Sequence, residues 1–133
     1  MASSVIISIR PFFVDPIFSR EKRFEFRRVV ARFRTGDRMI VYATAPLSLL
    51  VGEFRVGRVL TGTPEEVCAE TGADPLRRYT ASYLRGARCC TAIEIVDPRR
   101  WNAPMPLTRL KARIRAPQSY VFMKESDGLF RDN

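Results

Sequence analysis

The sequence predicts an α+β fold: a small mixed, mostly antiparallel β-barrel of about six strands with roughly three to four short helices. Apolar, β-branched runs recur along its 133 residues in the pattern of strands. The helix signals gather between residues 63 and 86 instead of alternating with strands. Gly52 and Gly57 interrupt a long strand, as bulges do where a small barrel bends to close. We expect one domain over residues 5–125, with loose ends at 1–4 and 126–133.

The N-terminal segment predicts a buried strand followed by a helix. Residues 5–9 are β-branched, and the strand should end at Arg10 because proline follows. Asp15 and Pro16 match the N-cap and first position of a short helix.

Residues 23–27 alternate charged and aromatic side chains, which is the periodicity of a strand. Phe24 and Phe26 should therefore face the core. The opposite face then carries the three charged side chains, Arg23, Glu25 and Arg27.

The middle of the chain predicts two further strands. Thr35-Gly36-Asp37 is a turn that leads into a strand over residues 39–43. Residues 49–60 form a longer strand that contains both glycines.

Two helices are indicated by the residues at their ends. Thr63 to Glu66 is a capping box, and Gly72 should end that helix. Asp74-Pro75 begins a second helix that ends at Gly86. Its expected core face consists of Leu76, Tyr79, Tyr83 and Leu84. Residues 89–96 and 119–123 then predict strands, with a helical turn at 107–111 between them.

Composition excludes several kinds of site. The chain has no histidine, which removes Ser-His-Asp and Cys-His nucleophile pairs and the common zinc sets. Its 3 cysteines fit no disulfide framework, and we expect them to be reduced and mostly packed in the core. We expect no metal site and no cofactor.

Charge points to a polyanionic partner. Lys and Arg number 23 against 14 Asp and Glu, a formal net charge of +9, which favours RNA or single-stranded nucleic acid. The alternative is that Arg-rich composition alone produces the surplus. Between Pro98 and Lys124 the basic residues occur without any acid, which indicates a face whose charges are all positive.

The sequence shows neither a signal peptide nor a membrane segment, so we expect a cytoplasmic protein that contacts no membrane.

The stretch from Lys22 to Arg27 resembles the GxKxxExR signature of ASCH domains, a group within the PUA-like superfamily. One position departs from the signature, because Arg20 stands where the motif has glycine, and a positive φ there would suit glycine better. Further elements of the resemblance extend over about residues 5–123: Gly36 to Ala43, Val51 to Gly57, Tyr83 to Gly86, Ala92 to Ile95 and Pro117 to Tyr120.

The resemblance implies a small barrel with a cleft that holds RNA or a modified base. In such a cleft Lys22, Glu25 and Arg27 would face the ligand, with Arg27 on a phosphate or carbonyl and Glu25 accepting from a base N–H. The alternative is that Glu25 simply pairs with Lys22 or Arg27 on an exposed sheet face. The complete set of expected ligand-binding residues is Arg10, Lys22, Glu25, Arg27, Tyr42, Trp101, Arg109, Lys111, Ser119 and Tyr120. For the aromatic residues the alternative is packing in the core, and for the basic run from Arg109 to Arg115 it is a solvated helix face.

Three functions remain open at this stage. The first is a non-catalytic module that reads a single-stranded or modified nucleotide. The second is a small hydrolase, either a ribonuclease or an amidohydrolase for an N4-acylated cytidine nucleoside, with Lys22, Glu25 and Glu53 as candidate catalytic residues. The ASCH group that this chain resembles includes a member that looks like such an amidohydrolase. That member has threonine at the place of Glu25, so the nucleophile that the resemblance implies is missing here. The third is a transcription regulator that binds a metabolite or a protein in the same cleft.

Overall fold

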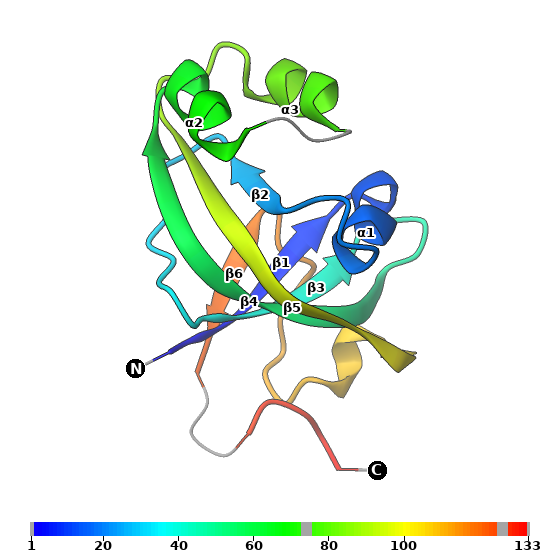
Figure 1. Cartoon of the computed structure of the whole chain (residues 1–133). Helices are drawn as coiled ribbons and strands as arrows, with labels where there is room; N and C mark the ends of the chain where they lie inside the picture. Colours follow the sequence, from blue (N-terminus) through cyan, green and yellow to red (C-terminus); the bar gives the residue numbers. More distant parts are fainter. Residues whose placement is uncertain (1, 73–75, 125–127, 133) are drawn as a thin grey trace.

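The computed structural model describes residues 2–72, 76–124 and 128–132, and its strands form one curved sheet (Figure 1). The strand order is β2-β5-β4-β3-β1-β6. The pair β1 and β3 is parallel and the other neighbours are antiparallel, so the predicted mixed, mostly antiparallel α+β fold is confirmed. The strands are β1 (Ser4–Ile9), β2 (Phe24–Arg27), β3 (Arg38–Ala43), β4 (Leu49–Gly62), β5 (Cys90–Met105) and β6 (Tyr120–Met123).

The sheet is a half-barrel, where the sequence predicts a barrel. Within the described residues, β2 and β6 are end strands with one neighbour each. The bending comes from the long pair β4 and β5, whose register shifts between Leu50 and Gly52 and again between Val56 and Val59. A Cβ on Gly52 would lie 2.5 Å from the Arg99 carbonyl oxygen, so only glycine fits there. The predicted bulges are confirmed, although they curve the sheet without closing it.

Helix α1 (Pro11–Phe18) starts earlier than predicted. Its N-cap is Arg10 and Pro11 takes the first turn, so the prediction of Asp15 and Pro16 at the start is wrong. Both prolines satisfy the rule for a first turn, and the chain uses the earlier one because it follows β1 directly. Pro16 lies inside the last turn of this short helix.

Helix α2 (Pro64–Thr71) has the predicted capping box. The Glu66 backbone N–H donates to the Thr63 hydroxyl over 3.2 Å, and the Thr63 N–H donates to the Glu66 carboxylate over 2.9 Å. A short 3-10 turn, η1 (Leu107–Arg109), confirms the predicted helical turn.

Helix α3 (Arg77–Leu84) differs from its predicted burial pattern. The predicted start at Asp74-Pro75 lies outside the described residues. Thr80 and Leu84 face the core, whereas Tyr79 and Tyr83 are 50% and 41% exposed. The prediction that both tyrosines belong to a core face is therefore wrong.

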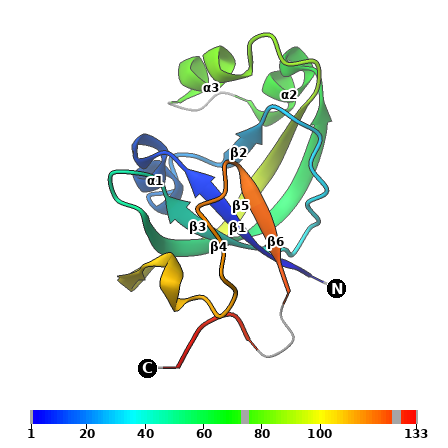
Figure 2. The ribbon, with the colours of Figure 1, turned by 180° about the vertical axis from the view of Figure 1, so that it is seen from behind.

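The buried side chains form three clusters that follow the alternation of the strands. Ile7 belongs to a cluster between the sheet and α1, and Ile6 points to the opposite face, where Leu110 and Leu129 cover it. In the third cluster Phe24 and Phe26 pack beneath α2 and α3, which confirms that both rings face the core. Figures 1 and 2 show α1 on one side of β2 and the α2–α3 pair on the other.

Two smaller sequence predictions concern cysteines and membranes. Cys68, Cys89 and Cys90 are free thiols. Cys90 is fully buried in the third cluster, and burial is the main cause that raises the pKa of its thiol. Among the described helices none is long and apolar enough to cross a membrane.

Candidate functional site

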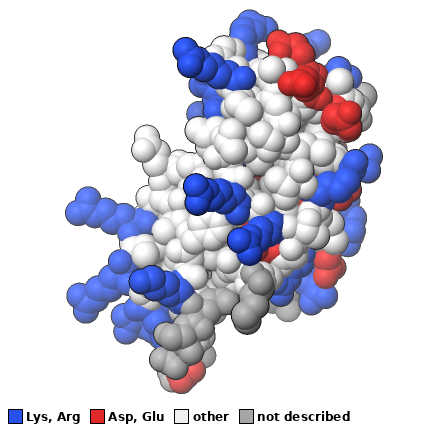
Figure 3. All heavy atoms as spheres, turned by 90° about the vertical axis from the view of Figure 1, so that its left-hand side faces the viewer, with Lys and Arg blue, Asp and Glu red and all other residues white. Residues whose placement is uncertain are grey.

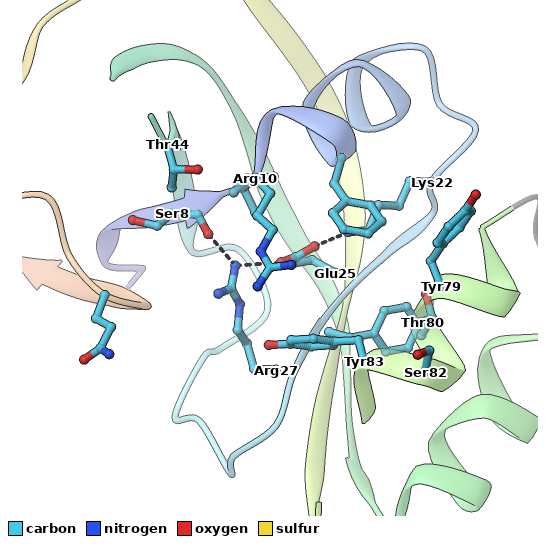
Figure 4. A pocket seen from close by; sticks show the side chains of 14 residues that line it. Ser8, Arg10, Lys22, Glu25, Arg27, Thr44, Tyr79, Thr80, Ser82 and Tyr83 are labelled. Carbon is cyan, nitrogen blue, oxygen red and sulfur yellow. Dashed lines mark hydrogen bonds and ion pairs between the residues drawn. The ribbon is translucent and has the colours of Figure 1, made fainter. Parts of the chain in front are cut away.

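A cavity of about 480 Å³ opens between α1, α3 and the strands β1 and β2. Its size lies in the range of about 300–1,000 Å³ that is common for small-molecule sites. Figure 4 shows Lys22 and Tyr79 at one end and Ser8 and Thr44 at the other. The lining residues are Ser8, Ile9, Arg10, Phe13, Lys22, Glu25, Phe26, Arg27, Thr44, Tyr79, Thr80, Ser82, Tyr83 and Gln118. We call this cavity the helix pocket.

The loop between α1 and β2 brings the lysine of the signature to the pocket. The Lys22 backbone N–H donates to the Pro16 carbonyl over 2.9 Å, which ties the loop to the end of α1. Arg20 has a φ of +71°, so this arginine adopts the left-handed conformation that we expected to favour glycine. The chain therefore makes this turn despite its departure from the signature.

Three charged side chains form an ion-pair network on the wall of the pocket. Glu25 Oε1 accepts a short hydrogen bond from Lys22 Nζ, and Glu25 Oε2 lies 2.6 Å from Arg27 Nη2 (Figure 4). All three residues are less than a tenth exposed. The ion pairs that the alternative expected are therefore present, but they are buried and do not lie on an exposed sheet face. The desolvated charges interact more strongly than surface pairs do.

Opposing effects act on the Glu25 carboxyl group. Burial is the largest and would raise its pKa, but the combined attraction and hydrogen bonds of Lys22 and Arg27 outweigh it and lower the pKa below the ordinary value. Glu25 is thus a carboxylate with a cation on each oxygen, an arrangement that makes it a good acceptor and a weak base.

Arg27 is fixed from several sides. Its Nη2 donates to the Ser8 carbonyl over 2.8 Å, and its Nη1 donates to the Ser119 hydroxyl over 3.3 Å. Among the described residues its Nε is a buried donor without an acceptor. A buried donor is normally satisfied, so this Nε is an exception among the buried donors of the described residues.

Aromatic side chains provide the apolar part of the pocket. Lys22 Nζ lies 4.5 Å from the centre of the Phe13 ring. Tyr79 and Tyr83 extend from α3 into the cavity (Figure 4). Sequence reasoning missed both tyrosines as site residues because their spacing matches an apolar helix face. The available signal is that α3 is a short, mostly polar helix with few large apolar residues to bury.

Two further candidates, Glu53 and Trp101, lie together, and they line neither the helix pocket nor the two smaller cavities that share residues with it. Glu53 forms a short ion pair with Arg38 and accepts a hydrogen bond from Trp101 Nε1 over 3.3 Å. Burial would raise the pKa of Glu53, but these hydrogen bonds outweigh it and lower the pKa. This cluster links β3, β4 and β5.

Tyr42 and Tyr120 are also outside the pocket. Tyr42 is buried in the second cluster, and Tyr120 packs edge-to-face against Phe33 at 4.8 Å between ring centres. Ser119 lies beside the pocket through its hydrogen bond with Arg27. The structure thus brings Arg10, Lys22, Glu25 and Arg27 into one cavity and leaves the predicted aromatic residues elsewhere.

The basic run of the C-terminal third, Arg109 to Arg115, lies between β5 and β6. Arg109 and Lys111 are not in the pocket, but the segment continues to Gln118, which lines it. Basic side chains are spread over the face shown in Figure 3, and a group of acidic ones lies at its upper end. Among the described residues, no group of three or more His, Cys, Asp and Glu side chains is placed to hold a metal ion.

Comparison with known proteins identifies the fold. No protein-family model matches the chain. A curated relative from Zymomonas mobilis, described as an ASCH domain-containing ribonuclease, is 25% identical over 127 residues, covering 92% of this chain and 85% of the relative. The crystal structure of ASCH from the same organism superimposes with a TM-score of 0.78 at 24% identity, over 92% of this chain and 89% of that one. The chain folds as an ASCH domain.

Other solved structures show how far this ASCH fold extends. A variant of the Zymomonas mobilis protein in which a tyrosine is replaced by phenylalanine gives a TM-score of 0.81 at 23% identity, over 92% of this chain and 91% of that one. The N-terminal domain of McrB from Staphylothermus marinus gives 0.51 at 12% identity, covering 81% of this chain and 78% of that one. The first match confirms the ASCH architecture over most of the chain, and the second shows a distant likeness of fold alone.

Proposed function

We propose that this ASCH domain binds RNA and receives one unpaired nucleotide in the helix pocket. One observation carries the proposal: a single cavity combines three cations and a carboxylate with two half-exposed tyrosines. Single-stranded RNA is recognised by the same combination, since cations attract its phosphates and aromatic rings stack on its splayed bases. The RNA-related name of the Zymomonas mobilis relative supports this assignment.

In this proposal each kind of side chain in the pocket has a different task. Arg10 is exposed at the rim and would meet a phosphate. The Arg27 guanidinium, which lines the pocket, would meet a carbonyl oxygen of the base or a phosphate oxygen. Glu25 would accept from a base N–H with its remaining lone pairs. Tyr83 would stack on the base from α3.

The basic C-terminal run would extend the binding surface beyond one nucleotide. Arg109 ends the turn η1, and the segment that follows it carries Lys111 and continues to Gln118 in the pocket. The Pro117 carbonyl of this segment accepts a hydrogen bond of 2.6 Å from the Ser8 hydroxyl. RNA leaving the pocket at this end would run beside a row of positive charges. These residues then contribute affinity with little dependence on sequence.

Anisotropy titrations with labelled single-stranded RNA test the proposal. Binding should weaken steeply as salt rises, because each neutralised phosphate releases counterions. Arg27→Gln should change which bases are preferred, whereas Lys111→Gln should weaken all sequences equally and flatten the salt dependence. If the wild-type protein binds no single-stranded RNA at low salt, the proposal is wrong.

A second candidate function is RNA cleavage, which the name of the curated relative favours. Cleavage next to a 2′-OH needs a proton acceptor and stabilisation of the charge on the phosphorus centre. Lys22 and Arg27 supply positive charge, but Glu25 is a weak base because cations hold both of its oxygens. The geometry therefore favours binding over cleavage.

Incubation of the protein with labelled RNA, and in parallel with N4-acetylcytidine, separates these functions. A ribonuclease would release defined fragments, and an amidohydrolase would release cytidine. Lys22→Ala should abolish either activity if the helix pocket is responsible. Turnover that survives this substitution would come from another site or from a contaminant.

A further inference from the structure

A second hollow lies beside the helix pocket. Its volume is about 270 Å³, and Lys22 lines both cavities, so the two adjoin at this residue. Lys22 also marks the end of the helix pocket that is opposite Ser8 (Figure 4). We call the second cavity the arginine hollow, and its lining residues are Ile17, Arg20, Lys22, Arg23, Glu94, Ile95 and Pro98.

The charges of the arginine hollow leave two guanidinium groups available. Arg20 and Arg23 are exposed, and among the described residues neither side chain forms an ion pair or hydrogen bond, although the charge of Arg23 helps to lower the pKa of Glu94. The one carboxylate in the lining, Glu94, is already engaged, since it accepts from the Arg58 backbone N–H over 3.1 Å and pairs with the Arg58 guanidinium at 3.5 Å. The hollow therefore presents net positive charge to solvent.

The backbone that carries these two arginines is held in place. The Arg23 carbonyl accepts a hydrogen bond of 2.8 Å from the Ile95 N–H on β5, and the Arg20 N–H donates to the Ile17 carbonyl over 3.3 Å. The Lys22 N–H donates to the Pro16 carbonyl as well, so the loop backbone is held at the lysine and on both sides of it. The guanidinium groups start from a preorganised loop, which lowers the entropic cost of binding an anion.

We propose that the arginine hollow is a phosphate subsite, which holds the RNA phosphate next to the nucleotide in the helix pocket. The inference rests on the proposed RNA binding. In one direction the bound RNA would pass the Lys22 end of the helix pocket and continue between Arg20 and Arg23. In the other direction it would run along the basic segment before β6. Two arginines on one phosphate provide several charge-assisted donors, and this geometry suits arginine better than lysine.

A pair of matched double variants tests this subsite. Arg20→Gln with Arg23→Gln removes two charges from the hollow, and Arg32→Gln with Arg34→Gln removes the same charge from a loop that lines neither cavity. Both are titrated against a labelled single-stranded hexanucleotide of mixed sequence over a range of salt. The first variant should bind about tenfold more weakly, and its log–log salt slope should become shallower by about 0.7 for each phosphate that the protein no longer neutralises. The control should stay close to the wild type.

Arg20→Gly is a second test variant, because a loss of RNA binding by this variant would not result from misfolding. Glycine suits the positive φ at this position, so the fold is kept or stabilised while the guanidinium is removed. RNA affinity should still fall. If the wild type binds RNA and both double variants bind it equally weakly, the subsite is wrong and the RNA binding stands. If the wild type binds no RNA, both proposals fail.

Discussion

The Arg27 guanidinium lies 2.6 Å from the Glu25 carboxylate, and both side chains are buried on the same face of β2. They share that face because they are two residues apart on a strand. Lys22 reaches the other carboxylate oxygen from the preceding loop. The carboxylate thus fixes both cations at the wall of the pocket, which explains why an acid stands inside a basic sequence.

Glu25→Gln should lower the free energy of unfolding by about 3–5 kcal/mol, because two buried cations lose their counter-charge. Urea unfolding followed by circular dichroism measures this change. Glu70→Gln is the matched control, since Glu70 is exposed and should change stability by less than about 0.5 kcal/mol. An equally small effect for Glu25 would mean that the network contributes nothing to the fold.

Acid should weaken the contribution of Glu25. Its pKa is lowered in the folded protein from an ordinary value of 4.5, so the unfolded chain binds more protons as pH falls below that value. The stabilisation by the Glu25 carboxylate is fully present above the ordinary pKa of 4.5 and is lost as the pH drops through the lower pKa of the folded state. The stability difference between wild type and Glu25→Gln should therefore shrink from neutral pH to about pH 3. A difference that stays constant over this range contradicts the assignment.

Arg20→Gly should raise the free energy of unfolding by about 0.5–1 kcal/mol. The gain from relieving the left-handed strain, about 1–2 kcal/mol, exceeds the added freedom of glycine in the unfolded chain. Thermal or urea unfolding measures it, with Arg20→Ala as the control, which removes the same side chain but keeps the strained Cβ. If both substitutions have the same effect, the positive φ of +71° is not a source of strain.

Tyr83→Ala should weaken binding of single-stranded RNA by about 1–3 kcal/mol, the usual contribution of one base stacked on an aromatic ring. Tyr83→Phe keeps the ring and should bind almost as tightly as the wild type. Anisotropy titrations at one fixed salt concentration give both values. Equal losses for the two variants would indicate that the hydroxyl, and not the stacking face, matters.

The sequence predicts the places of the strands well because their evidence is local, but the strand predicted over residues 89–96 is too short, since β5 continues to Met105. Alternation over residues 23–27 is enough to assign Phe24 and Phe26 to the core, and the structure confirms this. The capping box at Thr63 is likewise a pattern of adjacent residues. The start of α1 was predicted at the wrong proline, because Pro11 and Pro16 both suit a first turn and only the position of β1 decides between them.

The candidate site is harder to predict because it depends on which elements meet. Lys22, Glu25 and Arg27 come together since one short segment carries them all. Tyr79 and Tyr83 reach the same pocket from a helix far along the chain, and helical spacing alone cannot separate a core face from a pocket wall. Trp101 looked like a stacking residue from its basic neighbours, yet it lies with Glu53 outside the cavity.

Shift mapping by NMR tests RNA recognition in the helix pocket most directly. A short single-stranded RNA is titrated into isotope-labelled protein, and the amide and side-chain signals are followed. The largest shifts should occur at Lys22, Arg27, Tyr79 and Tyr83. Shifts confined to Trp101 and the basic run from Arg109 to Arg115, with the pocket unchanged, would contradict the account.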